Sequence, residues 1–212
     1  MTALVIGATG ATGKDLVSVL LQESSYSQVI IFVRRSSGIV HTRLKEVLTD
    51  FDKPQEVAEW IKGDVLFSCL GTTLKAAGSK DKQWHIDYEI PLQFAAIAKQ
   101  NGVSQMVLLS SYGASAGSNL FYSQLKGKLE DAIAKLGFEK YIIFRPGVLV
   151  RKYTDRAGER LSIALLNFFN RLHLFRKFKP MPTSKLAEKM AKAPTIFPDG
   201  RHMIELNKIF EL

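Results

Sequence analysis

The sequence contains a single cysteine, Cys69, so no disulfide can form within the chain. Disulfides persist in oxidising compartments and are rare in the cytosol, and this scarcity therefore favours a reducing compartment. The N-terminus has no basic segment followed by a long apolar stretch, so we expect no secretory signal. The cytoplasm is the predicted location.

Long apolar runs and metal-ligand spacings are also missing. No apolar run approaches the roughly 18 residues that a membrane-spanning helix needs, so no membrane span is predicted. The four histidines show no metal-ligand spacing with one another or with Cys69, and we predict no metal site. We find no internal repeat. A chain of 212 residues that is 46% hydrophobic is long enough for one well-buried domain and short for two.

Acidic residues are in deficit, because 20 Asp and Glu stand against 29 Lys and Arg, for a net charge of +9. The excess is concentrated in residues 151–180, which hold eight basic side chains and two acidic ones. Such a field attracts phosphorylated small molecules, nucleic acid, acidic lipid or an acidic protein partner, and does not choose among them. Since no nucleic-acid recognition motif accompanies the charge, we do not predict nucleic-acid binding.

Strand-length apolar runs alternate with helix-length periodic segments up to Arg145, which is typical of βαβ units. The expected strands are Leu4–Ile6, Val29–Val33, a weak one near Glu46–Leu48, Val65–Cys69, Met106–Leu109 and Tyr141–Phe144. The expected helices are Thr12–Gln22, Pro54–Lys62, Tyr88–Gln100 and Ser123–Leu136. The sequence thus predicts an α/β protein with a Rossmann-type doubly wound parallel sheet.

The alternation stops after Arg145. We expect residues 151–212 to form a small C-terminal cap for a substrate or partner, within a single domain spanning residues 1–212. The cap should contain a helix over Glu159–Phe175, a short helix ending before Pro194, and a strand in the tail. The apolar face of the first of these helices suits core packing or a homodimer interface.

Three glycines, Gly7, Gly10 and Gly13, follow the first expected strand and open the first expected helix. Gly7 can take the tight turn, Gly10 leaves room for a pyrophosphate, and Gly13 lets the helix pack closely on the sheet. The helix N-terminus supplies free N–H groups and partial positive charge, and Thr9 and Thr12 can add hydroxyl donors. The pattern predicts a dinucleotide site, with a purely structural turn as the alternative.

The end of the second expected strand bears on the kind of nucleotide. A cofactor with a free ribose 2′-hydroxyl usually meets an Asp or Glu at this place. Here the chain reads "IIFVRRSS", and Arg34 and Arg35 occupy the place. Guanidinium groups match a 2′-phosphate in charge and bidentate geometry, so NADP is predicted rather than NAD.

Tyr122 and Lys126 lie four residues apart and share one face of an expected helix. A free tyrosine is too weak a base at neutral pH, and a neighbouring ammonium favours the phenolate form. Such a pair can exchange a proton with a carbonyl or an alcohol while a nicotinamide carries the hydride. A serine at the end of the preceding strand, Ser110 or Ser111, would hold the substrate oxygen.

Taken together, these motifs resemble the short-chain dehydrogenase/reductase superfamily in its atypical NAD(P)-binding branch, and in particular the Tat-interactive oxidoreductase-like proteins and their bacterial relatives. The likeness runs over nearly the whole chain. It is carried by "GATGATG" from Gly7, "VRRSS" from Val33, "FSCLGTT" from Phe67, "LLSSYGA" from Leu108, "FYSQLKGKLE" from Phe121 and "FRPGVLVRKYTDRAGER" from Phe144.

The resemblance implies roles for residues on the cofactor. Those on the diphosphate would be Thr9, Gly10, Ala11 and Thr12, with Arg34 and Arg35 on the 2′-phosphate, Leu70, Gly71 and Thr72 on the adenosine and ribose side, Lys126 on the nicotinamide ribose, and the loop from Pro146 to Val148 beside the nicotinamide. Tyr122 would be the proton donor or acceptor, and Arg151 and Arg160 lie where a substrate or partner would bind.

The sequence departs from the superfamily in two places. Many members have an Asn that supports a proton relay at the place where "HIDYEIP" puts Asp87. The sequence therefore does not show whether this protein has that relay. Relatives that act on nucleotide sugars carry a longer C-terminal domain than the residues beyond Arg151 allow, which argues against an epimerase. We predict an NADP(H)-dependent oxidoreductase acting on a small carbonyl or alcohol. The alternative is a cofactor-sensing regulatory or scaffold protein that binds NADP(H) without turnover.

Overall fold

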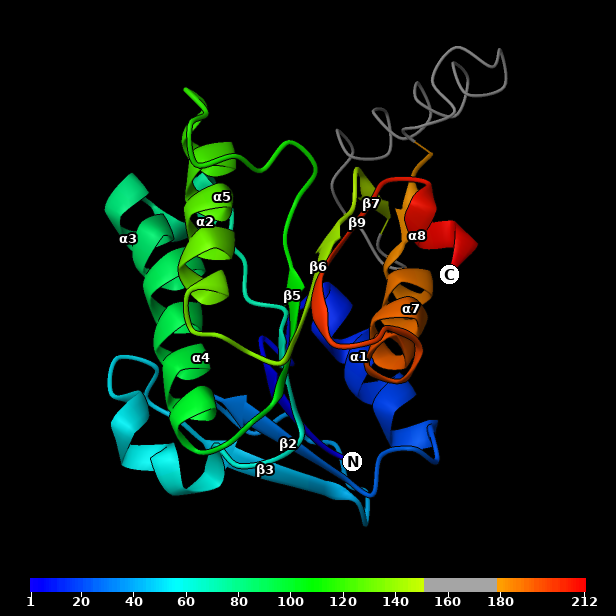
Figure 1. Ribbon diagram of the computed structural model, residues 1–212. Helices are drawn as coiled ribbons and strands as arrows, with labels where there is room; N and C mark the ends of the chain where they lie inside the picture. Colours follow the sequence, from blue (N-terminus) through cyan, green and yellow to red (C-terminus); the bar gives the residue numbers. More distant parts are fainter. Residues whose placement is uncertain (151–178) are drawn as a thin grey trace.

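The computed structural model describes residues 1–150 and 179–212, and its centre is a sheet of seven parallel strands (Figure 1). The strand order is β3-β2-β1-β4-β5-β6-β9. The bounds are β1 Thr2–Ile6, β2 Gln28–Val33, β3 Leu44–Leu48, β4 Val65–Ser68, β5 Gln105–Leu109, β6 Lys140–Arg145 and β9 Gly200–Glu205. A separate pair is formed by β7 Leu149–Val150 and β8 Met181–Pro182.

Helices cover both faces of the sheet, as Figure 1 shows, with α1 and α7 on one side and α4 and α5 on the other. The bounds are α1 Ala11–Gln22, the 3₁₀ helix η1 Pro54–Trp60, α2 Leu74–Ala77, α3 Lys80–Trp84, the π turn η2 His85–Glu89, α4 Ile90–Gln100, α5 Phe121–Ala134, α7 Thr183–Ile196 and α8 Lys208–Glu211. Two buried cores result, one on each face. These layers confirm the predicted Rossmann-type doubly wound fold.

The central strands are buried on both faces because helices cover both faces of the sheet. Leu4, Val5 and Ile6 of β1 are fully inaccessible, and they alternate between the two cores. A parallel strand of this kind reads as a continuous apolar run, which is why the strand predictions succeeded. The chain leaves the sheet in opposite directions after β1 and β4, so the carboxyl ends of these neighbouring strands border a crevice where ligands bind in such folds.

The C-terminal residues that the structure describes belong to these layers. β9 pairs in parallel with β6, and α7 packs against α1. The Tyr26 hydroxyl donates to the Ala191 carbonyl at 2.6 Å, and the Thr183 hydroxyl donates to Asp15 at 2.6 Å. The segment predicted to be part of a cap therefore extends the main sheet and completes one helix layer. The predicted helix over Glu159–Phe175 lies outside the described residues.

Two helix predictions need correction. The segment predicted as a helix over Pro54–Lys62 is a 3₁₀ helix ending at Trp60, held by the Asn101 amide, which donates to the Ala58 and Ile61 carbonyls at 2.8 and 3.0 Å. The helix predicted to end before Pro194 instead includes it and ends at Ile196. Pro194 has no N–H and so removes one backbone bond from the last turn of the helix, which ends two residues later.

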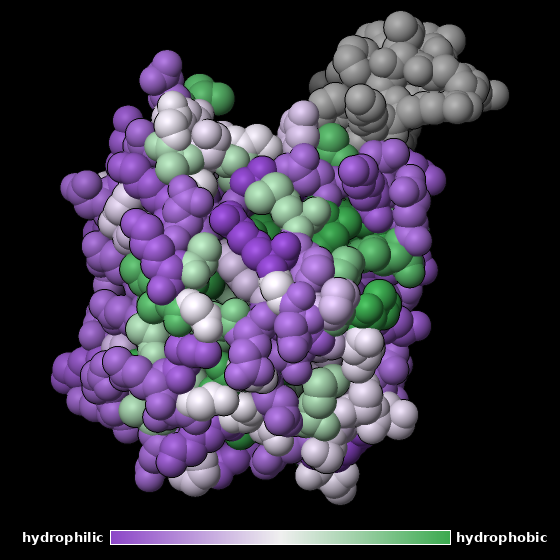
Figure 2. Space-filling view, viewed as in Figure 1, coloured by the Kyte–Doolittle hydropathy of each residue, from purple (hydrophilic) through white to green (hydrophobic). Residues whose placement is uncertain are grey.

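Figure 2 shows that hydrophilic side chains dominate the described surface on the face viewed in Figure 1. The more apolar side chains of this view gather near α8. Within residues 1–150 and 179–212, none of the helices is both long and apolar enough to span a bilayer.

Candidate functional site

The backbone is packed so tightly around the turn between β1 and α1 that two of its glycines cannot be replaced by a residue with a side chain. Gly7 has a φ of +78°, and a Cβ added to it would lie 2.5 Å from the Cys69 carbonyl carbon. A Cβ on Gly13 would lie 2.0 Å from the Gly7 carbonyl oxygen. These distances are shorter than any real Cβ contact, so the first glycine is needed for the turn and the third for packing of α1.

The N-terminus of α1 has no capping group of its own. Its N-cap residue is Gly10, no side chain caps the helix, and no acidic residue lies in its first turn. The N–H groups of Ala11, Thr12 and Gly13 therefore lie at the positive end of the helix dipole, where an anion is favoured. Thr9 is exposed beside them, whereas Thr12 is buried.

A cavity of about 930 Å³ opens at the carboxyl ends of β1, β2, β3 and β4. Eight of the predicted cofactor residues line it: Gly7, Thr9, Gly10, Arg34, Arg35, Leu70, Gly71 and Thr72. They come from three separate parts of the sequence, and both arginines are exposed at its rim. Of the predicted residues, Ala11, Thr12 and Gly13 lie in the adjoining helix turn without lining it.

Sequence reasoning missed one residue of the lining after β2 and the parts that follow β3 and come from η2 and α4. These residues are Ser36, Asp50, Phe51, Asp52, His85, Ile86 and Ile90. The available signal was the "TDFD" stretch after the weakly predicted third strand, because carboxyl ends of parallel strands meet at one edge of the sheet. Nothing in the local sequence around His85 indicated that it reaches the same cavity.

His85 joins two elements at this edge. Its Nδ1 lies 2.6 Å from Glu89 Oε2, and its Nε2 lies 2.7 Å from Asp52 Oδ1. The hydrogen bond with Glu89 and then that with Asp52 raise the pKa of His85 above its ordinary value. The imidazole thus connects the loop after β3 to η2 along one wall of the cavity.

Tyr122 and Lys126 both lie on α5, and their environments differ. Tyr122 is in the first turn of the helix and is 40% exposed, whereas Lys126 is 2% exposed. The Lys126 ammonium donates to the Leu70 carbonyl at 3.4 Å. It therefore contacts the loop after β4 that lines the cavity, and it links the cavity to α5.

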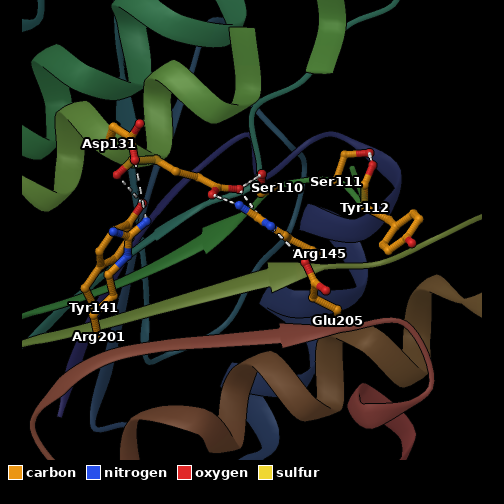
Figure 3. A network of polar contacts seen from close by, with 9 residues as sticks. Ser110, Ser111, Tyr112, Asp131, Tyr141, Arg145, Arg201 and Glu205 are labelled. Atoms are coloured by element: carbon orange, nitrogen blue, oxygen red, sulfur yellow. Dashed lines mark hydrogen bonds and ion pairs between the residues drawn. The ribbon is translucent and has the colours of Figure 1, made fainter. Parts of the chain in front are cut away.

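The two candidate serines at the end of β5 have separate surroundings (Figure 3). Ser110 is buried, and its hydroxyl donates to Glu130. Glu130 is 1% exposed and accepts from Arg145 Nε at 2.9 Å, while Arg145 Nη1 donates to Glu205 at 2.8 Å. The hydroxyl of Ser110 is thus engaged in an interior network that joins β5, α5, β6 and β9.

Ser111 is half-buried, and its hydroxyl makes a long 3.4 Å bond to the Tyr112 carbonyl. The Tyr112 N–H donates to the Pro146 carbonyl at 3.0 Å, so the predicted loop beside the nicotinamide lies next to Ser111. Val148, in the same loop, is 36% exposed, and its carbonyl accepts from Met181. Arg151 and Arg160 lie outside the described residues.

The structure also bears on two points raised by the sequence, the single cysteine Cys69 and the predicted lack of a metal site. Burial raises the pKa of the Cys69 thiol to about 12, against the opposing effect of Lys126, so the thiol is a poor nucleophile although it borders the cavity. In the described parts of the chain, His, Cys, Asp and Glu form no group suited to a metal ion.

Comparison with known proteins agrees with this geometry. The model of the NAD(P)H-binding family matches residues 7–163. The chain belongs to this family. It is 36% identical over 166 residues to Protein HTATIP2 of Rattus norvegicus, covering 76% of this chain and 68% of the relative. It is 33% identical over 195 residues to the mitochondrial Protein FMP52 of Candida albicans, covering 89% of this chain and 85% of the relative.

Solved structures show the same fold at low sequence identity. A short-chain dehydrogenase/reductase superfamily protein of Agrobacterium tumefaciens with bound NAD superposes with a TM-score of 0.73 at 16% identity, covering 97% of this chain and 77% of the other. The oxidoreductase ylbE of Lactococcus lactis gives 0.66 at 18% identity, covering 92% and 85%. Together with the family model and the relatives at 33% and 36% identity, this confirms the resemblance to the atypical NAD(P)-binding branch. The FMP52 relatives are named as mitochondrial, so the cytoplasmic location stays a prediction for this chain.

Proposed function

We propose that this protein is an NADP(H)-dependent oxidoreductase that transfers a hydride to or from a small carbonyl compound or alcohol. The observation that carries the proposal is the cavity that gathers the glycine turn, Arg34 and Arg35, and loop 70–72 at one edge of the sheet. Lys126, which follows Tyr122 by four residues on α5, donates to the Leu70 carbonyl of that loop. The candidate acid–base pair would therefore lie beside the cofactor site.

The residues present fit a phosphorylated dinucleotide. The uncapped start of α1 and the glycine turn before it would hold the diphosphate, because free backbone N–H groups at the positive end of the helix dipole favour an anion. Arg34 and Arg35, exposed at the rim, would hold the 2′-phosphate. When bound, the cofactor supplies the hydride.

The chain's own groups would manage the proton and the substrate oxygen. Tyr122, partly exposed at the start of α5, would exchange a proton with the substrate oxygen, and Lys126, four residues further along the same helix, would supply a neighbouring positive charge. Ser111 would orient the same oxygen, since the hydroxyl of Ser110 is already bonded to Glu130. The loop from Pro146 to Val148 would border the reacting ring.

Calorimetric titration with NADPH and NADH tests the cofactor assignment. We expect wild type to prefer NADPH, and Arg34→Ala combined with Arg35→Ala to lose about tenfold or more in NADPH affinity with little change for NADH. The matched control removes two exposed lysines on α7 and α8, Lys192→Ala with Lys208→Ala, and should bind as wild type. An equal loss of NADPH affinity in both double variants would show that net charge, and not the position of the arginines, causes the effect. Equal affinity of wild type for the two cofactors would refute the NADP assignment.

A further inference from the structure

Loop 70–72, which follows β4 and lines the cofactor cavity, is held by three buried polar side chains. The Thr72 N–H donates to Asp87 Oδ1 at 2.8 Å, and the Thr72 carbonyl accepts from the Gln83 amide at 3.0 Å. On the other side of the loop the Leu70 carbonyl accepts from Lys126. Asp87, Gln83 and Lys126 are 0%, 3% and 2% exposed. Three helical segments thus hold the backbone of Leu70 and Thr72, at the two ends of the loop, beside the cavity.

Asp87 reaches this position through a local irregularity. It lies in the middle of the π turn His85–Glu89, which interrupts the helical run between α3 and α4. The same turn places His85 and Ile86 in the cavity lining. Single π turns within helices are frequent at functional sites because they redirect side chains. Here the turn presents one residue to the interior and two to the cavity.

The second carboxylate oxygen of Asp87 is the unusual feature. Oδ2 is buried and has no hydrogen-bond partner among the described residues. A buried carboxylate oxygen without a donor is costly, and natural proteins retain such groups chiefly at functional sites. The charged group that faces Asp87 is the Lys126 ammonium, while its other neighbours, Gln83 and the Thr72 backbone, are neutral.

We propose that Asp87 is a positioning residue of the cofactor site: with Gln83 it holds loop 70–72 so that the loop faces the cavity and keeps the Leu70 carbonyl against the Lys126 ammonium. The inference rests on the proposed NADP(H) function and deepens it. Asp87 would act through Thr72 on the cofactor and through its charge on Lys126, without touching the reacting atoms.

The energetic cost of this arrangement gives the proposal a distinctive signature. Burial raises the pKa of Asp87, and Lys126, the Thr72 N–H and the Gln83 side chain only partly oppose the shift. An acid whose pKa is raised by folding binds its proton more tightly in the folded protein. Keeping it ionised therefore costs stability, and the cost grows as the pH rises from the ordinary value through the raised one. A merely structural carboxylate would stabilise the fold, whereas this one is expected to cost stability.

The test compares Asp87→Asn, which keeps an acceptor oxygen and the side-chain size, with Asp81→Asn, which removes an exposed charge from the first turn of α3. NADPH affinity is measured by calorimetry at pH 7.5, and stability by urea unfolding. We expect Asp87→Asn to bind NADPH about tenfold more weakly than wild type, with an unfolding midpoint at least as high, and Asp81→Asn to bind as wild type.

Two results would overturn the proposal: unchanged NADPH affinity in Asp87→Asn, or a parallel loss of affinity and stability.

The Thr72 amide resonance in ¹H–¹⁵N spectra separates this inference from the proposed function. It should titrate with pH in wild type and Asp81→Asn and stay constant in Asp87→Asn. If it does so while wild type fails to bind NADPH, the loop anchor stands and the proposed function fails. If it does not titrate in wild type, the anchor itself is refuted.

Discussion

At the scale of single residues, burial divides side chains that look equivalent in the sequence. Ser110 and Ser111 are adjacent, yet one is bonded to a buried glutamate and the other makes only a long bond to the Tyr112 carbonyl. Lys126 is one of many lysines, but its burial and its bond to Leu70 distinguish it. Chemistry at this site therefore depends on which neighbour each group meets, and a sequence motif does not record that.

The role of Tyr122 is the prediction that belongs to this scale. Tyr122→Phe removes the exchangeable proton while keeping the ring, so turnover of NADPH with a carbonyl substrate should fall by about 10²- to 10⁴-fold. The affinity for NADPH should stay within about twofold, because the hydroxyl is assigned to the substrate. Steady-state kinetics over a carbonyl panel, with calorimetry in parallel, provides the measurement.

Tyr88→Phe is the control for this variant, since Tyr88 stacks on Trp84 and does not line the cavity. It should leave turnover unchanged. Full activity in Tyr122→Phe would remove Tyr122 from the mechanism. Normal NADPH binding in wild type with no turnover of any carbonyl would favour the cofactor-sensing regulator instead.

At the scale of elements, close backbone packing decides where the helices sit. α1 begins directly above the turn after β1, and Gly13 allows its backbone to approach the Gly7 carbonyl. α5 is fixed by the pair of Glu130 with Arg145, whose Nη2 lies 2.5 Å from Glu130 Oε2. These contacts place the start of α1 and the Tyr122 face of α5 around the same end of the sheet.

Gly13→Ala tests the packing of α1. The added Cβ would meet the Gly7 carbonyl oxygen at 2.0 Å, and backbone on both sides leaves nothing to move cheaply. We expect a loss of about 3 kcal/mol in the free energy of unfolding, as for overpacked cores. Gly117→Ala, where no atom lies within 4 Å of the added Cβ, should change it by less than about 0.5 kcal/mol. Similar urea midpoints for the two variants would disprove the steric account.

Element predictions succeeded where a pattern is local and failed where a distant contact decides. The expected strands all formed, and the central ones are continuous apolar runs buried on both faces, whereas β3 and β9 at the sheet edges are partly exposed. Pro54–Trp60 became a 3₁₀ helix held by Asn101, and the π turn at His85–Glu89 was not predicted. The 3₁₀ helix depends on Asn101, a side chain far away in the sequence. The π turn depends on how Asp87 packs against loop 70–72.

At the scale of the whole molecule, the stability of the fold depends on the ionisation of His85 in the cavity wall. His85 connects the loop after β3 with η2, and its hydrogen bonds favour the charged form. A group whose pKa is raised by folding stabilises the protein fully below its ordinary value, near 6.5 for histidine, and loses that contribution as the pH rises through the raised value. Stability from this group is therefore greatest in mildly acidic solution.

His85→Gln should reveal this dependence. The difference in unfolding free energy between wild type and His85→Gln is expected to be largest near pH 6 and to shrink by pH 9, in urea titrations at both values. His202→Gln serves as the comparison, because the His202 ring contacts the Pro198 carbonyl rather than a carboxylate. A wild-type advantage over His85→Gln that does not change with pH would argue against an ionic contribution from His85.

The sequence by itself determined the fold class, the glycine turn, the two arginines after the second strand and the spacing of Tyr122 and Lys126. Each is a short-range pattern of backbone or helix geometry, so no distant residue is needed to interpret it. Only the tertiary structure decided that Asp50–Asp52 and His85 share the cavity, that Glu130 engages Ser110, that Asp87 lies beneath loop 70–72, and that β9 completes the sheet. These are contacts between segments far apart in the chain, and burial creates them only when the layers pack.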